Sequence, residues 1–264
     1  MGRETSKSVL LRRSGAVIEL VLNRPERLNA IDDEVAADLL EGLESVAGEP
    51  GCRCLVITGS GRGFCSGQAL PSAQSGSLPR QIGALVRERY IPLVTAIQLL
   101  PIPVLAAVNG VAAGAGFALA LAADLRVAAD DAWFTCGFAA IGLVPDSGAS
   151  YFLPRYLGLS KALQLALTSE RLSAPKAAEL GLLARVFPAA SFHRDSLAFA
   201  QELASGPTKA FALTKQAFRE GLGFNLGAQL ELEADLQQQA SETADFREGL
   251  LAFRQKRPPR FTGH

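Results

Sequence analysis

A single acid follows a proline in the segment IGLVPDSGASYFLPR, residues 141–155. Asp146 stands there between two apolar runs, where its carboxylate could take a proton from a substrate and return it. An aspartate before Ser-Gly and a helical run is also typical of a helix N-cap, a role worth about 1 kcal/mol. The local sequence alone favours the cap, so a catalytic role depends on motifs elsewhere in the chain.

Two glycine-bearing segments offer main-chain N–H groups rather than side chains: GSGRGFCSGQAL (59–70) and NGVAAGAGFALAL (109–121). The first has Phe64 where a dinucleotide fingerprint needs glycine, and it lacks the Gly-Lys-Ser/Thr end of a phosphate loop. The second leads into a helix, whose unpaired N–H groups and dipole favour negative charge. One N–H from each segment, if the two segments met in space, could hold a developing enolate oxygen.

The composition argues against several other chemistries. Lys and Arg total 26 and Asp and Glu total 26, so no net charge or basic stretch indicates a nucleic-acid groove. His193 and His264 are the only histidines, which argues against a histidine metal site or a Ser-His-Asp triad. The four cysteines show neither CxxC spacing nor a disulfide framework, which predicts a reducing compartment, the cytoplasm. Cys65 has no neighbouring base, so loop packing is favoured over a nucleophilic role.

Neither the start nor the middle of the sequence predicts a membrane protein. The first 14 residues, MGRETSKSVLLRRS, contain no apolar signal core. Residues 104–123 are apolar over a membrane-like length, but they are rich in Ala and Gly and contain the turn signal Asn109-Gly110. A strand, a turn and a buried helix are therefore expected there.

The elements that must position these groups alternate between strands and helices. Two strands are expected within 8–23, a capped amphipathic helix over 32–48, and strands over 52–59, 102–108 and 125–130, with helices over 81–99 and from about 115. Later helices are expected at 160–168, 175–180, 190–204, 207–221, 228–241 and 243–256. This order predicts an α/β core over residues 1–195 and an α-helical extension over residues 196–264.

Four motifs, in this order and spacing, resemble the crotonase superfamily (enoyl-CoA hydratase/isomerase). They are LNRPERLNAID, GRGFCSGQAL, VNGVAAGAGFALALAADLRVAAD and IGLVPDSGASYFLPRYLG, and the resemblance extends over roughly 8–261. It implies a spiral of ββα units, with C-terminal helices that assemble homotrimers or dimers of trimers. It also implies an acyl-CoA thioester as substrate, with no metal and no cofactor other than the CoA that the substrate carries.

The resemblance also implies roles for individual residues. The two oxyanion donors fall on the main-chain N–H groups of Gln68 and Ala115. The residues implied to contact CoA are Arg27, Leu28, Ala30, Ser66, Gln68, Leu70 and Lys256, of which Lys256 could reach the CoA of an adjacent subunit.

The chain departs from the hydratases of this family at two positions. Those enzymes hold a water molecule between two glutamates, and this chain has Ala118 and Phe138 there. The acid appears instead at Asp146, as in the family's Δ3,Δ2-enoyl-CoA isomerases, which have glutamate, and its 1,2-epoxyphenylacetyl-CoA isomerases, which have aspartate. Ala69 is a mismatch, because those isomerases usually have aspartate after the glutamine.

The resemblance therefore predicts an acyl-CoA isomerase in which Asp146 shuttles a proton beside an oxyanion hole. Phe138, Phe152 and Trp133 are expected to dry the acyl pocket and to raise the pKa of Asp146, and residues 71–90 are expected to shape that pocket. Two alternatives stay open: hydration or another crotonase-type reaction, and a non-catalytic CoA-binding assembly protein.

Overall fold

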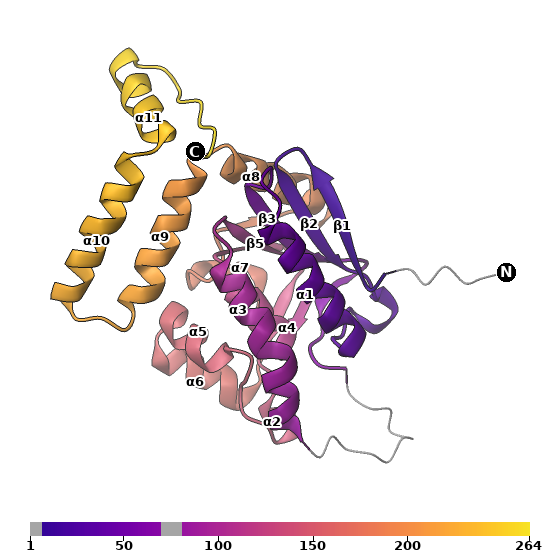
Figure 1. The fold of residues 1–264 in the computed structure, drawn as a ribbon. Helices are drawn as coiled ribbons and strands as arrows, with labels where there is room; N and C mark the ends of the chain where they lie inside the picture. The colour runs from indigo at the N-terminus through magenta and orange to yellow at the C-terminus, as the bar shows by residue number, and fades with distance from the viewer. Residues whose placement is uncertain (1–6, 70–80) are drawn as a thin grey trace.

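The computed structural model describes residues 7–69 and 81–264. It contains a six-stranded sheet in the order β1-β2-β3-β5-β7-β10 and a four-stranded sheet in the order β4-β6-β8-β9 (Figure 1). The larger sheet consists of β1 (Val9–Ser14), β2 (Val17–Leu22), β3 (Cys54–Gly59), β5 (Val104–Val108), β7 (Leu125–Ala129) and β10 (Arg185–Phe187). The smaller sheet consists of β4 (Gly63–Cys65), β6 (Val111–Ala113), β8 (Trp133–Thr135) and β9 (Leu172–Ser173).

The two sheets are built from a repeated strand pair. β3, β5 and β7 lie side by side and parallel in the larger sheet, and each is followed directly by a short strand of the smaller sheet, β4, β6 or β8. A helical segment follows each pair and leads the chain back to the next strand. This is the predicted spiral of ββα units. The β1–β2 hairpin extends the larger sheet at one edge.

The helices of the core cover these sheets. They are η1 (Pro25–Arg27), α1 (Asp33–Ala47), α2 (Ile82–Leu85), the π-helical turn η2 (Val86–Tyr90), α3 (Ile91–Leu99), α4 (Ala115–Ala122), η3 (Ala139–Ile141), α5 (Ala149–Leu157), α6 (Leu159–Thr168), α7 (Ala174–Glu179), η4 (Ala189–Ser191) and α8 (Phe192–Ala204). The expected cap of α1 is present, because Val35 N donates to Asp32 Oδ1 at 2.9 Å. α1 packs on β1 and β2, whereas α8 packs on β2, β3, β7 and β10.

The apolar stretch 104–123 is a buried strand, a turn and a buried helix, as predicted. β5 is buried along its whole length, and every residue of α4 is buried. Small side chains suit α4 because the helix is enclosed on all sides. Among the described residues, no helix has the length and apolarity needed to cross a membrane.

The strongly periodic segments agree with the prediction to within a few residues. The helical run expected after Asp146-Ser-Gly is α5. The sequence did not predict the short strands of the smaller sheet, each two or three residues long. A strand of that length spans about one period of side-chain alternation, so the sequence contains no pattern to detect.

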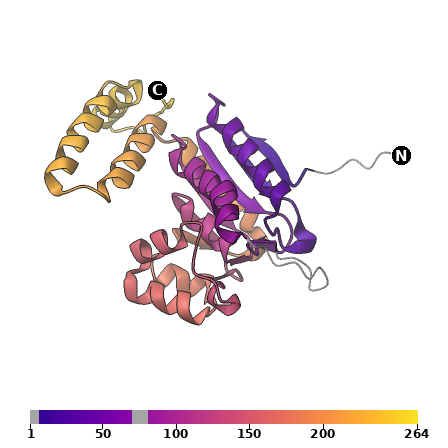
Figure 2. The same cartoon turned by 60° about the horizontal axis from the view of Figure 1, so that its bottom comes forward.

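The C-terminal helices α9 (Thr208–Gly221), α10 (Leu226–Ser241) and α11 (Ala244–Gln255) extend away from the sheets (Figures 1 and 2). The predicted boundary between residues 195 and 196 falls inside α8, whose Phe199 and Ala200 belong to the main hydrophobic core. The change in packing comes after α8 because that helix has an apolar face to bury against the sheet.

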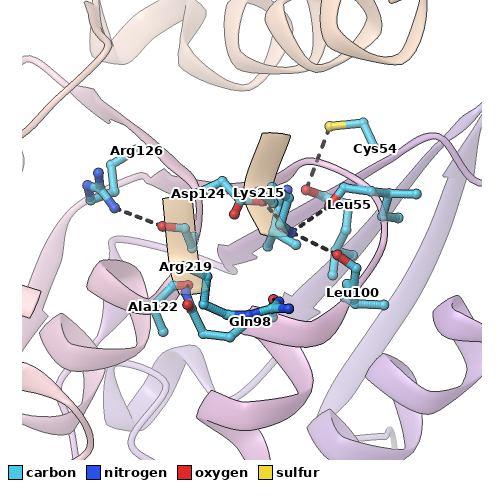
Figure 3. Close-up of polar contacts among 12 residues, drawn as sticks. Cys54, Leu55, Gln98, Leu100, Ala122, Asp124, Arg126, Lys215 and Arg219 are labelled. Atoms are coloured by element: carbon cyan, nitrogen blue, oxygen red, sulfur yellow. Dashed lines mark hydrogen bonds and ion pairs between the residues drawn. The ribbon is translucent and has the colours of Figure 1, made fainter. Parts of the chain in front are cut away.

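One buried ion pair anchors α9 to the core. Lys215 Nζ lies 2.7 Å from Asp124 Oδ2 and donates to Leu100 O at 2.9 Å and Ile102 O at 2.8 Å (Figure 3). One turn further along α9, Arg219 Nη1 donates to Gln98 O at 3.0 Å. These contacts hold α9 against the connection from α3 to β5 and against the residue after α4.

Candidate active site

The two glycine-bearing segments meet in space. A Cβ atom built on Gly67 would lie 3.3 Å from Ala115 N and 2.7 Å from Ala113 O. One built on Gly116 would lie 2.3 Å from Cys65 O. Neither position has room for a side chain, and Gly67 also has a φ of +95°, so glycine permits the close approach of the two loops.

Two main-chain N–H groups are available where the loops meet. Gln68 forms a parallel bridge with Ile31, in which Ile31 N donates to Gly67 O and Ala69 N donates to Ile31 O, both at 2.8 Å. This pattern turns the N–H of Gln68 away from Ile31. Ala115 is the first residue of α4, where N–H groups have no acceptor within the helix. The arrangement is chemically suited to holding a negatively charged oxygen.

Asp146 lies in the turn before α5, and its side chain does not cap that helix. The N-cap is Gly148, which makes no side-chain cap bond, and Ala149 N donates to the main-chain oxygen of Asp146 at 2.8 Å. The Asp146 carboxylate instead accepts a hydrogen bond from Ser147 Oγ at 2.8 Å. The capping interpretation of this acid is therefore wrong.

The surroundings of Asp146 favour its protonated form. The residue is half-buried, and burial raises the pKa of its carboxyl group, while the Ser147 hydrogen bond lowers it. Ser147 itself has a φ of +52°, a conformation that is uncommon for a residue with a side chain. The tight turn 146–148 keeps the carboxyl group next to a hydroxyl donor.

Tyr90 connects the acid to the glycine loops. Burial is the largest cause of its raised pKa, and the charges of Cys65 and Asp146 raise that pKa further. A Cβ atom built on Gly148 would lie 3.7 Å from Val94 Cγ1, and Val94 is one helical turn after Tyr90. Tyr90 Oη donates to Gln68 Oε1 at 2.7 Å. Asp146, Tyr90 and Gln68 therefore lie in one region of the molecule.

Sequence reasoning missed Tyr90 and its neighbour Arg89, which donates to the same Gln68 oxygen at 2.8 Å. Both belong to the stretch 71–90 that was expected to shape the acyl pocket; residues 70–80 lie outside the described part of the chain. The only available signal was the polar pair Arg89-Tyr90 within an apolar helical segment.

The positions of the hydratase glutamates contain no acid. Ala118 is fully buried inside α4, and Phe138 is buried where β8 leads into η3. Phe152 packs under the Asp146 turn, since a Cβ atom on Gly148 would lie 2.7 Å from its ring. Trp133 lies at the start of β8, where Arg171 stacks on its ring at 4.3 Å from the centroid, and its described contacts are not with Asp146.

The environment of Cys65 is that of a packing residue and not of a nucleophile. Its side chain is fully buried, Sγ accepts from Gly67 N at 3.4 Å, and burial raises the pKa of the thiol to about 12. A thiol of that pKa is protonated near neutral pH and is a poor nucleophile.

Most residues implied to contact CoA lie together. Ser66 N donates to Leu28 O at 2.9 Å, and Ser66 Oγ donates to Arg27 O at 3.2 Å. Ala30 N donates to Arg27 O at 3.2 Å, which closes the same loop. The buried side chain of Asn29 holds this loop to β4 by donating to Gly63 O at 2.7 Å.

Two other residues of that set are not joined to this group. Leu70 lies outside the described residues. Lys256 is the exposed C-cap of α11. In Figure 1, α11 lies at the far left, away from β2 and α1, the elements that flank the Arg27 loop in the chain. Within one chain, Lys256 is not brought to this loop.

Known proteins resemble the chain over nearly its whole length. Residues 12–264 match the family described as Enoyl-CoA hydratase/isomerase. The chain is 47% identical to "Probable enoyl-CoA hydratase" of Rhodobacter capsulatus, covering 92% of this chain and 93% of that protein. It is 44% identical to 1,2-epoxyphenylacetyl-CoA isomerase of Escherichia coli, covering 94% and 95% of the two chains.

A solved structure shows the same fold. The crystal structure of an enoyl-CoA hydratase from Bacillus anthracis superimposes with a TM-score of 0.90 at 30% identity, covering 97% of this chain and all of that one. The match in sequence and the match in fold agree with the ββα spiral. The chain belongs to the enoyl-CoA hydratase/isomerase family, the crotonase superfamily.

Proposed function

We propose that this protein is an acyl-CoA isomerase in which Asp146 moves a proton along a thioester enolate. The observation that carries the proposal is one half-buried, non-capping acid, Asp146, in a chain that has Ala118 and Phe138 at the two positions of the hydratase glutamates. With a single acid, the same group can remove a proton and return it elsewhere on the substrate. Double-bond migration needs only those two steps.

The reaction balances without an added reactant. Asp146 removes a proton from the carbon between the thioester carbonyl and the double bond, and the electron pair moves onto the thioester oxygen. The N–H groups of Gln68 and Ala115 hold that oxygen, and losing one such donor typically costs about 3 kcal/mol of transition-state stabilisation. Asp146 then gives its proton to the carbon at the far end of the original double bond, and the new double bond is conjugated with the carbonyl.

The raised pKa of Asp146 supports this role. A carboxylate that holds a proton more tightly is a stronger base toward a weakly acidic C–H group. The ring of Phe152, which packs under the Asp146 turn, is proposed to keep water from the carboxyl group and so to contribute to that shift. Water exclusion also disfavours hydration of the conjugated product.

For the acyl group, we propose a ring-bearing substrate of the 1,2-epoxyphenylacetyl-CoA kind. The E. coli relative bears that name, and its 44% identity extends over 94% of this chain. Gln68 and Asp146 match the isomerase pattern, whereas Ala69 does not. An aliphatic enoyl-CoA is the second substrate candidate within the same activity.

For CoA, we propose contacts with the loop containing Arg27, Leu28 and Ala30, and with Ser66, Gln68 and Leu70. Lys256 would contribute from an adjacent subunit of a homotrimer or a dimer of trimers. The four cysteines are free and buried, which fits the reducing cytoplasm that the sequence predicts.

The first prediction concerns Asp146→Asn. The amide has nearly the same shape but cannot take a proton, so conversion of 3-hexenoyl-CoA to the conjugated thioester should fall about a thousandfold. The ultraviolet absorbance of the conjugated thioester measures the reaction. CoA-thioester binding should be retained, as measured by calorimetry.

Asp131→Asn is the matched control, since Asp131 is exposed in the turn between β7 and β8 and should leave the rate unchanged. A fully active Asp146→Asn enzyme would refute the proposal. The hydratase alternative, favoured by the name of the R. capsulatus relative, predicts rapid loss of conjugated absorbance with crotonyl-CoA. A non-catalytic protein would bind these thioesters and turn over none.

A further inference from the structure

The side chain of Gln68 is held by two donors from the π-helical turn η2 (Val86–Tyr90). Its Oε1 atom accepts from Arg89 Nη1 at 2.8 Å and from Tyr90 Oη at 2.7 Å. A carbonyl oxygen has two lone pairs, so both are occupied. The amide nitrogen donates to Ala69 O at 3.0 Å, and the orientation of the whole side chain is thereby fixed.

The side chains of these two donors are largely enclosed by the protein. Tyr90 is 3% exposed, and the Arg89 side chain is 9% exposed and forms an ion pair with Asp33 at the start of α1. Consecutive residues of an α-helix point about 100° apart, but here both reach one oxygen. The π-helical turn is the local distortion that accompanies this convergence, and such turns are frequent at functional sites.

The residue they hold is one of the proposed oxyanion donors. The bridge to Ile31 fixes the main chain on either side of Gln68 but does not engage its own N–H. The Gly67 carbonyl that accepts from Ile31 N belongs to the same planar peptide as the Gln68 N–H, so that bond restrains the N–H at one end of the peptide. The side-chain bonds to Arg89 and Tyr90 restrain the same residue a second time, through its side chain.

We propose that Tyr90 and Arg89 are positioning residues, which aim the Gln68 N–H at the thioester oxygen through the Gln68 side chain. The inference rests on the proposed function, because it assumes that this N–H holds the enolate. Small displacements of such groups cost large factors in rate.

The test is Tyr90→Phe, which removes only the hydroxyl group. We expect kcat for 3-hexenoyl-CoA to fall about tenfold with KM within about twofold, because a misaimed donor is weakened rather than lost. Carbonyl polarisation gives a second readout: the infrared band of bound butyryl-CoA, labelled with ¹³C at the carbonyl, should shift less from its free position than in the wild-type protein. Butyryl-CoA has no carbon–carbon double bond for the enzyme to shift, so this readout does not depend on turnover.

Tyr156→Phe is the matched control. Tyr156 is a partly buried tyrosine whose hydroxyl donates to Leu121 O at 3.3 Å and does not touch Gln68. It should leave both readouts unchanged.

A double-mutant cycle separates positioning from general packing. Gln68→Met removes the side-chain amide and keeps the main-chain N–H. If Tyr90 acts through that side chain, Tyr90→Phe should have no further effect on kcat in the Gln68→Met background. Additive losses would overturn the inference, as would a Tyr90→Phe enzyme with wild-type kcat and an unchanged carbonyl band. A wild-type protein that leaves the butyryl-CoA carbonyl band unmoved would refute the oxyanion site, and the inference with it.

Discussion

Asp146 shows how a neighbouring hydroxyl and partial burial act on one carboxyl group in opposite directions. Burial raises its pKa above the ordinary value of 3.8, and the Ser147 hydroxyl, 2.8 Å away, lowers the pKa by stabilising the charged form. In the proposed isomerase, one group both takes and returns a proton, so its pKa should lie above that of a free carboxylic acid and closer to the working pH. At the residue scale, Ser147 is therefore expected to tune the base.

We predict that Ser147→Gly moves the acid limb of the rate profile to higher pH. Asp146 acts as a base only when ionised, so kcat/KM should fall as the pH drops through its pKa. Without the hydroxyl donor that pKa rises, because the hydrogen bond from Ser147 stabilises the charged carboxylate. The measurement is kcat/KM against pH for the variant and the wild-type enzyme.

Ser147→Ala separates the hydroxyl from the backbone effect. Alanine at a φ of +52° is strained, whereas glycine is not. Both variants should show the same limb, and the alanine variant, which keeps the Cβ atom at this φ, should be the less stable of the two. An acid limb that stays in place in both would contradict the assignment of this limb to Asp146.

At the scale of elements, the candidate active site depends on the tertiary contacts that hold α4 and its neighbours in place, as well as on the helix propensity of their residues. α4 begins at Ala115, one of the proposed donors, and Asp124 follows shortly after its end. Burial raises the pKa of Asp124 and lowers that of Lys215, and the charge of each partner opposes that effect. The pair therefore joins α9 to the end of the segment that carries the oxyanion hole (Figure 3).

We predict that Lys215→Met lowers the free energy of unfolding by about 3 kcal/mol at neutral pH. The variant leaves the partly buried Asp124 carboxylate without its ammonium partner, and a charge removed from water in this way is costly when it loses its partner. Denaturant titration measures the change. Because the folded-state pKa of Asp124 lies above its unfolded value, the cost should be present above the folded pKa and should shrink as the pH falls through it.

Lys209→Met is the control, since Lys209 is exposed on the same helix and should change stability by less than about 0.5 kcal/mol. A Lys215→Met protein as stable as this control would contradict the prediction, because it would show that the ion pair stabilises the fold no more than an apolar contact at the same position.

At the scale of the whole molecule, the C-terminal helices expose more apolar surface than a monomer usually does. Within the described residues, α9 to α11 and their connections expose large apolar side chains at 42% or more: Phe218, Leu222, Phe224, Leu226, Leu230, Phe246, Leu250, Leu251 and Phe253. Leu236 and Ala252 are among the few residues of α10 and α11 that are buried. Surfaces of this kind mark sites of protein association.

We predict that the protein in solution has three or six times the chain mass of 27.8 kDa, measured by light scattering. Phe253→Glu should dissociate that assembly, because Phe253 is 83% exposed in the single chain and a buried glutamate would destabilise an interface. Gln255→Glu, two residues further on, introduces the same charge and should leave the mass unchanged. A wild-type protein that is monomeric at all concentrations would contradict the expectation.

Much of the fold was determined by local patterns in the sequence. The Asp32 cap, the apolar spacing of α1 and the apolar runs of β3 and β5 each act within a few residues, and the elements form as predicted. The glycine segments and the Asp146 turn were recognisable for the same reason: each motif is contiguous. The short strands of the smaller sheet were not predictable, because each forms only when a neighbouring strand, remote in the sequence, supplies its hydrogen bonds.

Only the tertiary structure decided how these pieces act together. The local sequence around Asp146 favoured a cap, and the fold placed Gly148 at that position instead. The contact of Gly67 with Ala115, and the convergence of Arg89 and Tyr90 on Gln68, join residues more than 20 positions apart in the chain. A linear sequence specifies its local conformation through near neighbours, but the distance between remote side chains is set by the packing of whole elements.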